Sequence, residues 1–180
     1  MNLAQIWRYP IKSHGSENLN SIDIHSGKTL PLDRTWAVVH DQSDADGSRW
    51  VPCRNFSRVA KAPQLAAIST TWTSDKKLEL SHPSIGKICI DPDVDSSKFI
   101  NWVSPLMPGN RAASVKLIRS VQTGMTDTDF PSISIGNLAS HREIEKKVGE
   151  KLSLLRWRCN LWIDGCKPWD EHKWIGKSLK

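Results

Sequence analysis

Short stretches rich in β-branched, aromatic and leucine residues, each bounded by glycine, proline, aspartate or serine, constrain the fold of this chain more than any other feature. Six such stretches occupy the first half of the sequence: residues 4–9, 21–25, 35–40, 66–73, 77–81 and 87–90. Short strands at this spacing, with turn residues between them, are typical of antiparallel sheets and small barrels. We therefore expect the amino-terminal part to be a β-barrel.

Turn and helix signals complete this first half. Residues 44–47 (Asp-Ala-Asp-Gly) predict a turn that joins strands at 36–39 and 49–51 into a hairpin. Residues 55–59 predict a helical turn that ends before Pro63, because proline cannot continue a helix. Residues 92–104 predict a helix, with its apolar side chains on one face.

The carboxyl-terminal part mixes strands with one clear helix. Strands are expected at 115–118 and 132–135, and again at 156–164. A helix is expected from Ser140, because Glu143 follows at capping-box spacing and Gly149 stands where a left-handed cap belongs. We expect Ile144 and Val148 to form its buried stripe. The chain is thus predicted to be mainly β with some α, an α+β fold.

Composition excludes several classes of protein. The 180 residues carry 25 Lys and Arg against 19 Asp and Glu, a net charge of +6. This excess is mild and dispersed, and no nucleic-acid reader motif accompanies it, so nucleic acid is not expected as a partner. The four cysteines form no C-x-x-C pair, which argues against a zinc site or a disulfide framework. Reduced thiols fit a cytoplasmic location best. No apolar run of about 20 residues is present, so we expect no membrane span.

Two polar-basic clusters set among apolar residues are the first functional signal. One is residues 8–13 (Arg-Tyr-Pro-Ile-Lys-Ser), and the other is residues 156–160 (Arg-Trp-Arg-Cys-Asn). Ammonium and guanidinium groups beside main-chain donors suit a phosphate, so the clusters suggest two walls of one anion pocket. Alternation along a strand would place Arg158 and Asn160 on one face. The alternative is that both clusters are solvated strand ends, with Arg34 paired to Asp33 or another carboxylate.

The order of several motifs resembles that of a known family. They lie at residues 8–13, 32–38 (Leu-Asp-Arg-Thr-Trp-Ala-Val), 157–160, 164–165 (Asp-Gly), 168–169 (Pro-Trp) and 174–176 (Trp-Ile-Gly). Together they resemble MOSC proteins that carry an N-terminal MOSC β-barrel domain, the group that includes the mitochondrial amidoxime reducing component and bacterial relatives. The resemblance implies an N-terminal MOSC barrel over residues 1–115. It also implies that residues 116–180 are the first part of a MOSC barrel that is truncated at Lys180.

The same resemblance implies a molybdenum cofactor, a pterin dithiolene that ends in a phosphate. Lys12 and Ser13 match the family's basic-hydroxyl pair at that phosphate, and Arg34 matches an arginine that reaches the same anionic end. Arg158 and Asn160 match the Arg-x-Asn that contacts the pterin from the opposite wall.

The loop at residues 123–130 departs from the family pattern. Relatives carry Ser or Thr near the pterin there, and Thr128 is expected to donate a hydroxyl. Asp127 and Asp129 would repel a phosphate unless they face water or are protonated.

The resemblance leaves the metal without a ligand in this sequence. The family's molybdenum-binding cysteine lies on a strand beyond the Trp-Ile-Gly segment, past the last residue of this chain. Cys159 and Cys166 do not occupy the matching position, and a buried cysteine is usually inert packing. We therefore assign no catalytic residue and no metal ligand.

Three functions follow as alternatives. The first is an oxidoreductase that, in the complete protein, reduces N-hydroxylated small-molecule substrates with electrons from a redox partner protein. The second is a non-redox module that carries sulfur or handles the molybdenum cofactor. The third is an interaction scaffold that binds no cofactor.

Overall fold

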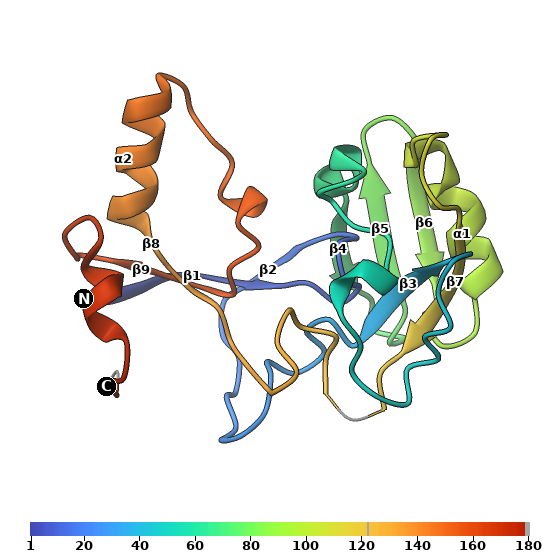
Figure 1. The fold of residues 1–180 in the computed structure, drawn as a ribbon, viewed down its shortest axis with the longest axis horizontal. Helices are drawn as coiled ribbons and strands as arrows, with labels where there is room; N and C mark the ends of the chain where they lie inside the picture. Colours follow the sequence, from blue (N-terminus) through green and yellow to red (C-terminus); the bar gives the residue numbers. More distant parts are fainter. Residues whose placement is uncertain (122, 179–180) are drawn as a thin grey trace. The chain divides into compact units, whose positions relative to one another are not determined.

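The computed structural model describes residues 1–121 and 123–178 (Figure 1). Gln122, Leu179 and Lys180, and with them the predicted truncation point, lie outside the described residues. The chain divides into two compact units. The smaller comprises residues 1–7, 18–22 and 133–180, and the larger comprises residues 8–17 and 23–132.

The larger unit contains two antiparallel sheets and one α-helix. Strands β4 (Ser69–Trp72), β5 (Leu78–His82) and β6 (Gly86–Ile90) form the first sheet in the order β4-β5-β6. Strands β3 (Trp36–His40) and β7 (Ser114–Arg119) form the second. Helix α1 (Ser96–Val103) and three short 3-10 helices, η1 (Cys53–Asn55), η2 (Pro63–Ala67) and η3 (Ser104–Leu106), connect the strands.

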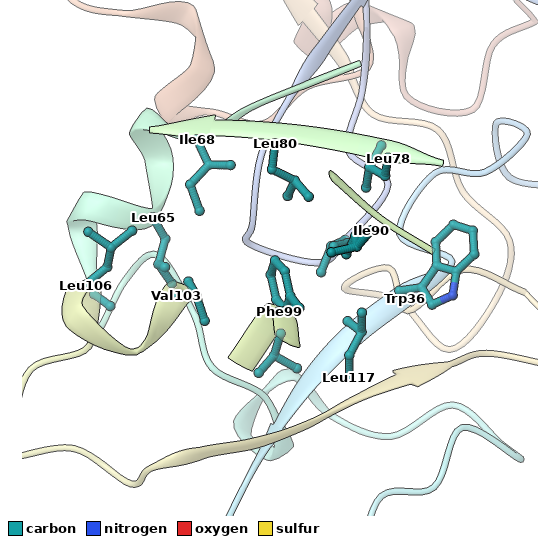
Figure 2. Close-up of a cluster of buried hydrophobic side chains, with 13 residues drawn as sticks. Trp36, Leu65, Ile68, Leu78, Leu80, Ile90, Phe99, Val103, Leu106 and Leu117 are labelled. Atoms are coloured by element: carbon teal, nitrogen blue, oxygen red, sulfur yellow. The ribbon is translucent and has the colours of Figure 1, made fainter. Parts of the chain in front are cut away.

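Alternation along strands and helical spacing build the core of this unit. On β5, Leu78 and Leu80 are fully buried at period two, while Glu79 between them is half-buried. On α1, Phe99 and Val103 are buried at the i, i+4 spacing of one helix face. Figure 2 shows Leu78 and Leu80 pointing from β5 toward Phe99. The helix predicted at 92–104 is confirmed over residues 96–103.

The smaller unit is one mixed sheet with a helix. Strands β1 (Asn2–Arg8), β2 (Glu17–Leu19), β8 (Ile135–Asn137) and β9 (Leu161–Asp164) are ordered β2-β1-β9-β8. Strand β9 is antiparallel to β1 and parallel to β8. Helix α2 (Leu138–Val148) follows β8 directly, and 3-10 helices η4 (Leu154–Arg156) and η5 (Asp170–Trp174) flank β9. The terminal residues Arg8 of β1 and Glu17 of β2 belong to the larger unit.

Strands and helices together confirm the α+β class. The described strands form three separate sheets rather than one closed cylinder. No helix in the described residues is long and apolar enough to cross a membrane.

The predicted hairpin at 36–51 is wrong. Residues 49–51 form no strand, and β3 pairs with β7 instead, with Val38 opposite Leu117. Gly47 does adopt the left-handed region (φ 92°), but a Cβ there would collide with the Arg119 carbonyl. The glycine therefore allows its loop to pass close against β7 rather than forming a hairpin turn. The strand predicted at 21–25 is also wrong, because the nearest strand in the sequence is β2 (Glu17–Leu19).

Helix α2 begins earlier than predicted. Its N-cap is Asn137, whose side-chain oxygen accepts a hydrogen bond from Ala139 N at 3.0 Å. Ser140 is not a cap, because its hydroxyl donates to Glu171 and accepts from Trp169 N. The buried positions are Ala139, Ser140 and His141 rather than Ile144 and Val148, and Val148 is exposed. The left-handed cap at Gly149 is confirmed, with φ 83°.

The strand predicted at 156–164 is confirmed only from Leu161 onward. Residues 154–156 form η4, and Arg158 has a left-handed backbone (φ 53°). A positive φ interrupts the pleat, so the period-two argument that placed Arg158 and Asn160 on one face does not apply.

Candidate anion site

Two chain segments run side by side in the larger unit and bring Lys12 and Arg34 into one region. Arg34 N donates to Tyr9 O at 2.7 Å, and Trp36 N donates to Pro10 O at 3.1 Å. Lys12 N in turn donates to Trp36 O at 2.7 Å. Pro10 has no N–H to contribute, yet its carbonyl still serves this parallel ladder. The ladder fixes the backbone at both cations.

Left-handed residues redirect the chain at both positions. Ser13 has φ 66° and Arg34 has φ 51°, a region that residues other than glycine seldom occupy. Both residues are nearly buried, so tertiary contacts hold these conformations. Strained backbone conformations of this kind cluster at active sites and ligand-binding sites.

A third segment, residues 124–128, completes the region. Met125 N donates to Arg34 O at 2.7 Å, which fixes this loop against the left-handed turn. A Cβ at position 124 would collide with the Asp33 carbonyl, so this close approach requires Gly124. The Trp50 indole donates to Thr126 O at 3.0 Å and supports the loop from the other side.

The Lys12 ammonium is buried and surrounded by oxygen atoms. The residue is 5% exposed, and Nζ donates to Met125 O at 2.8 Å, Thr126 O at 3.4 Å and Asp127 Oδ1 at 2.6 Å. The Asp127 side chain is 82% exposed. The sequence alternative of a solvated Lys12 is therefore wrong, and Asp127 faces water while it contacts the ammonium.

Burial lowers the pKa of Lys12 below its ordinary value, because the ammonium loses hydration. The hydrogen bond and the charge of Asp127 act in the opposite direction, whereas the positive charge of Arg34 lowers the pKa further. Two cations thus act on each other within one buried region, and their repulsion must be balanced by anionic groups.

Arg34 is held by Asp33 and Tyr9. Its guanidinium forms an ion pair with the Asp33 carboxylate and lies 4.9 Å from the centroid of the Tyr9 ring. Asp33 is 1% exposed and also accepts a hydrogen bond from Tyr9 N at 2.8 Å. The sequence alternative that paired Arg34 with Asp33 is confirmed. We call Lys12, Asp33, Arg34 and Asp127 the Lys12 cluster.

Thr128 lies on the same loop, beside this cluster. Its hydroxyl donates to Phe130 O at 2.8 Å and lies 2.8 Å from Ser132 Oγ. Its carbonyl accepts from the Thr126 hydroxyl at 3.0 Å. The structure therefore brings four of the predicted residues, Lys12, Ser13, Arg34 and Thr128, into one unit.

The other two predicted residues, Arg158 and Asn160, belong to the smaller unit. Asn160 is 1% exposed, and its amide nitrogen donates to Trp7 O at 3.1 Å. Its amide oxygen accepts from the Ser134 hydroxyl at 2.9 Å. These bonds join β1 to the segment before β8, so Asn160 supports the sheet of its own unit. The joint action of the two basic clusters on one ligand stays a prediction.

Sequence reasoning missed part of what organises the cluster. It considered Asp33 as a partner of Arg34, but it gave no role to Tyr9 and treated Asp127 as a source of repulsion rather than as the partner of Lys12. A buried cation requires a partner, so the search for carboxylates near Lys12 and Arg34 was the available signal. The sequence gives no distance between residues 12 and 127. Because they are far apart along the chain, no sequence pattern indicated that they form an ion pair.

Comparison with known protein families identifies one match. The model of the MOSC N-terminal beta barrel domain matches residues 1–104, more than half of the chain. This range includes Lys12, Ser13 and Arg34 but not Thr128, Arg158 or Asn160. Among curated proteins, none matches the chain.

Proposed function

Because this chain belongs to the MOSC N-terminal beta barrel domain family, whose members are associated with the molybdenum cofactor, we propose that it binds the phosphate of that cofactor through the Lys12 cluster. One observation carries the proposal. The buried Lys12 ammonium lies 2.6 Å from a carboxylate oxygen of Asp127, a side chain that is 82% exposed.

The contact between Asp127 and Lys12 supports the fit of an anionic group beside the ammonium. An oxygen with negative charge sits at hydrogen-bond distance from Lys12 Nζ, and it reaches this place from the solvent side. A phosphate oxygen, like a carboxylate oxygen, carries negative charge and accepts charge-assisted hydrogen bonds from an ammonium group. The residues therefore fit a phosphate that replaces the Asp127 carboxylate beside Lys12.

The charges of the cluster support the same conclusion. Two cations face two carboxylates, and only Asp33 is fully buried. When Asp127 turns to water, one positive charge remains uncompensated in a poorly hydrated place, where charge-assisted bonds are strong. Asp33 meanwhile keeps the Arg34 guanidinium oriented.

The other predicted residues have subsidiary roles in this proposal. The Ser13 hydroxyl supplies a neutral donor near the phosphate, and the Thr128 hydroxyl, which donates to Phe130 O, supports the loop that carries Asp127. The contacts of Arg158 and Asn160 with the pterin stay a prediction. The bound cofactor would supply redox chemistry at molybdenum for the reduction of N-hydroxylated compounds in the complete protein, with electrons from a redox partner. The described residues bind and orient, and their cationic groups offset the charge of the phosphate.

Replacement of Lys12 tests the proposal. The full chain is produced in cells that make the molybdenum cofactor, and the pterin that copurifies is oxidised and measured by fluorescence. We expect Lys12→Gln to lose most of the pterin, and Lys12→Arg to keep part of it because the charge remains. The matched control is Lys87→Gln, which removes an exposed lysine paired with Glu79 at 3.3 Å.

Circular dichroism of each variant verifies that the fold is retained. The proposal fails if the wild-type chain carries no pterin under these conditions, or if Lys12→Gln and Lys87→Gln retain equal amounts.

A further inference from the structure

A second cationic region lies in the larger unit, apart from the residues of the Lys12 cluster. It is a cavity of about 340 Å³ whose lining includes four basic side chains, Arg54, Arg58, Lys61 and Arg111. No aspartate or glutamate lines it. We call these four residues the basic pocket. The chain has a net charge of only +6, so four uncompensated cations around one cavity are a local concentration of charge.

The fold gathers these cations from two segments that are about 50 residues apart. Arg54 lies in η1, and Arg58 and Lys61 follow it, whereas Arg111 lies between η3 and β7. Ser57 N donates to Val38 O at 2.9 Å, and the Ser57 hydroxyl lies 2.7 Å from Ser114 Oγ. These two bonds fix the first segment across both strands of the β3-β7 sheet. The pocket is therefore built on paired backbone rather than on one isolated loop.

The cations of the basic pocket are not neutralised by the protein. Across residues 1–121 and 123–178, none of the four takes part in an ion pair. Arg58 Nη1 donates to Cys53 Sγ at 3.2 Å. A neighbouring cavity differs, because it is lined by Asp44 and Asp46 as well as Arg49. Uncompensated like charges repel one another, and an anion in the pocket would relieve that repulsion.

The basic pocket also has apolar and neutral polar walls. Phe56 is buried and Met107 is half-buried, and both line the cavity. His40 lines it as well, with Nε2 at 2.7 Å from Arg54 O, which fixes the ring against η1. Guanidinium groups bind phosphate oxygens in pairs, and an apolar wall accommodates an organic group beside them.

We propose that the basic pocket binds a small phosphorylated molecule that carries at least two negative charges. Three arginines and one lysine line a cavity large enough for a diphosphate with a small organic group. This site shares no residue with the Lys12 cluster, so it does not depend on the proposed cofactor function.

Inorganic pyrophosphate is the probe for this site. It is titrated into the full chain, and backbone amide signals are followed by NMR, which separates the two regions residue by residue. We expect saturable shifts at Arg54, Asn110 and Arg111. Arg54→Gln and Arg111→Gln should each weaken this binding about fivefold to tenfold, because each removes a charge-assisted donor. A rise from 50 to 200 mM NaCl should weaken it as well.

Matched variants separate a built site from general attraction to a basic protein. Arg49→Gln removes the same charge beside the acidic cavity and should leave pyrophosphate affinity at Arg111 within about twofold. Lys12→Gln should abolish shifts at Met125 and Thr126 only. The proposal is overturned if pyrophosphate gives no saturable shifts at Arg54 and Arg111, or if Arg49→Gln weakens binding as much as Arg111→Gln. It is also overturned if Lys12→Gln removes the shifts at Arg111. Absence of pyrophosphate shifts at Met125 and Thr126 in the wild-type chain would count against the cofactor proposal and not against this one.

Discussion

The Lys12 cluster and the basic pocket are both cationic, yet the protein treats their charges in opposite ways. In the cluster, each buried cation contacts a carboxylate, Lys12 with Asp127 and Arg34 with Asp33. In the basic pocket, four more accessible cations line a cavity without any carboxylate. Burial accounts for this contrast, because a buried ion requires a partner whereas water can stabilise an exposed one. A ligand must therefore displace an anion in the cluster but only water and salt ions in the pocket.

Loss of the buried Asp33 carboxylate should have the largest effect on the Lys12 cluster. Asp33→Asn leaves the Arg34 guanidinium without its charged partner in a nearly buried place. We expect a loss of about 3 kcal/mol in the free energy of unfolding. Urea denaturation followed by circular dichroism measures it. The control Glu79→Gln removes the exposed partner of Lys87 and should cost less than about 1 kcal/mol. Equal losses in the two variants would refute the distinction between buried and exposed pairs.

Gly124→Ala should disturb the cluster and leave the basic pocket intact. The added methyl group would collide with the Asp33 backbone, which cannot rotate aside as a side chain can. We expect a loss of about 1–3 kcal/mol in stability, as for other overpacked positions. Gly109→Ala is the control, because a Cβ there meets nothing within 4 Å. NMR signals of Arg54 and Arg111 should not move in Gly124→Ala, and shifts there would mean that the two regions are coupled.

High pH should weaken anion binding at the Lys12 cluster more than at the arginines of the basic pocket. Lys12 binds anions only when it is protonated, and burial lowers its pKa below the ordinary value of 10.5. Sulfate affinity at Met125 and Thr126 should therefore fall as the pH rises through the lowered pKa, at a pH below 10.5. The guanidinium groups of the basic pocket stay charged in this range, because arginine side chains remain protonated in proteins. Sulfate keeps a constant charge in this pH range. Its binding to the Lys12 cluster and to the basic pocket is followed by NMR.

The lowered pKa of Lys12 also determines whether stability rises or falls with pH. Between the lowered pKa and 10.5, the unfolded chain binds more protons at Lys12 than the folded chain does. The contribution of Lys12 to stability should rise with pH in this window, so wild-type stability should increase relative to Lys12→Met. A constant difference between the two proteins from pH 7 to 10.5 would contradict the assigned shift.

Asp127→Asn should give the smallest effect. The change removes the carboxylate that competes with a ligand for Lys12. We expect the phosphate affinity measured at Met125 to increase by up to about fivefold, because the free energy of a partly exposed ion pair is usually of this size. Asp129→Asn is the control, an exposed aspartate on the same loop. Weaker phosphate binding in Asp127→Asn than in Asp129→Asn would show that Asp127 does not compete with the ligand.

Local patterns predicted the elements whose signals lie within a few residues. Leu78 and Leu80 alternate on β5, Phe99 and Val103 share a helix face, and Gly149 caps α2. Features that depend on distant partners were missed. The pairing of β3 with β7 joins residues about 80 positions apart, and a nearby turn signal at Gly47 gave the wrong partner. The left-handed backbone at Arg158 similarly broke a strand that its composition favoured.

The candidate site divides in the same way. The motifs identified Lys12 and Arg34, and the parallel ladder of residues 9–12 with 33–36 brings them together. The ion pair between Lys12 and Asp127 spans 115 residues, and no local pattern predicts it. Asn160 appeared in a ligand motif, yet its observed bonds to Trp7 and Ser134 are structural. A motif therefore identifies important residues more reliably than it identifies the atoms they contact.

The ladder between residues 9–12 and 33–36 has one practical consequence for engineering. It holds both ends of the intervening chain, and residues 23–28 within that chain are exposed, with open space around Gly27. The entropy of closing a loop grows only with the logarithm of its length, so each doubling adds about 0.6 kcal/mol. A peptide tag inserted at Gly27 should therefore report on the protein in cells without moving Lys12 or Arg34.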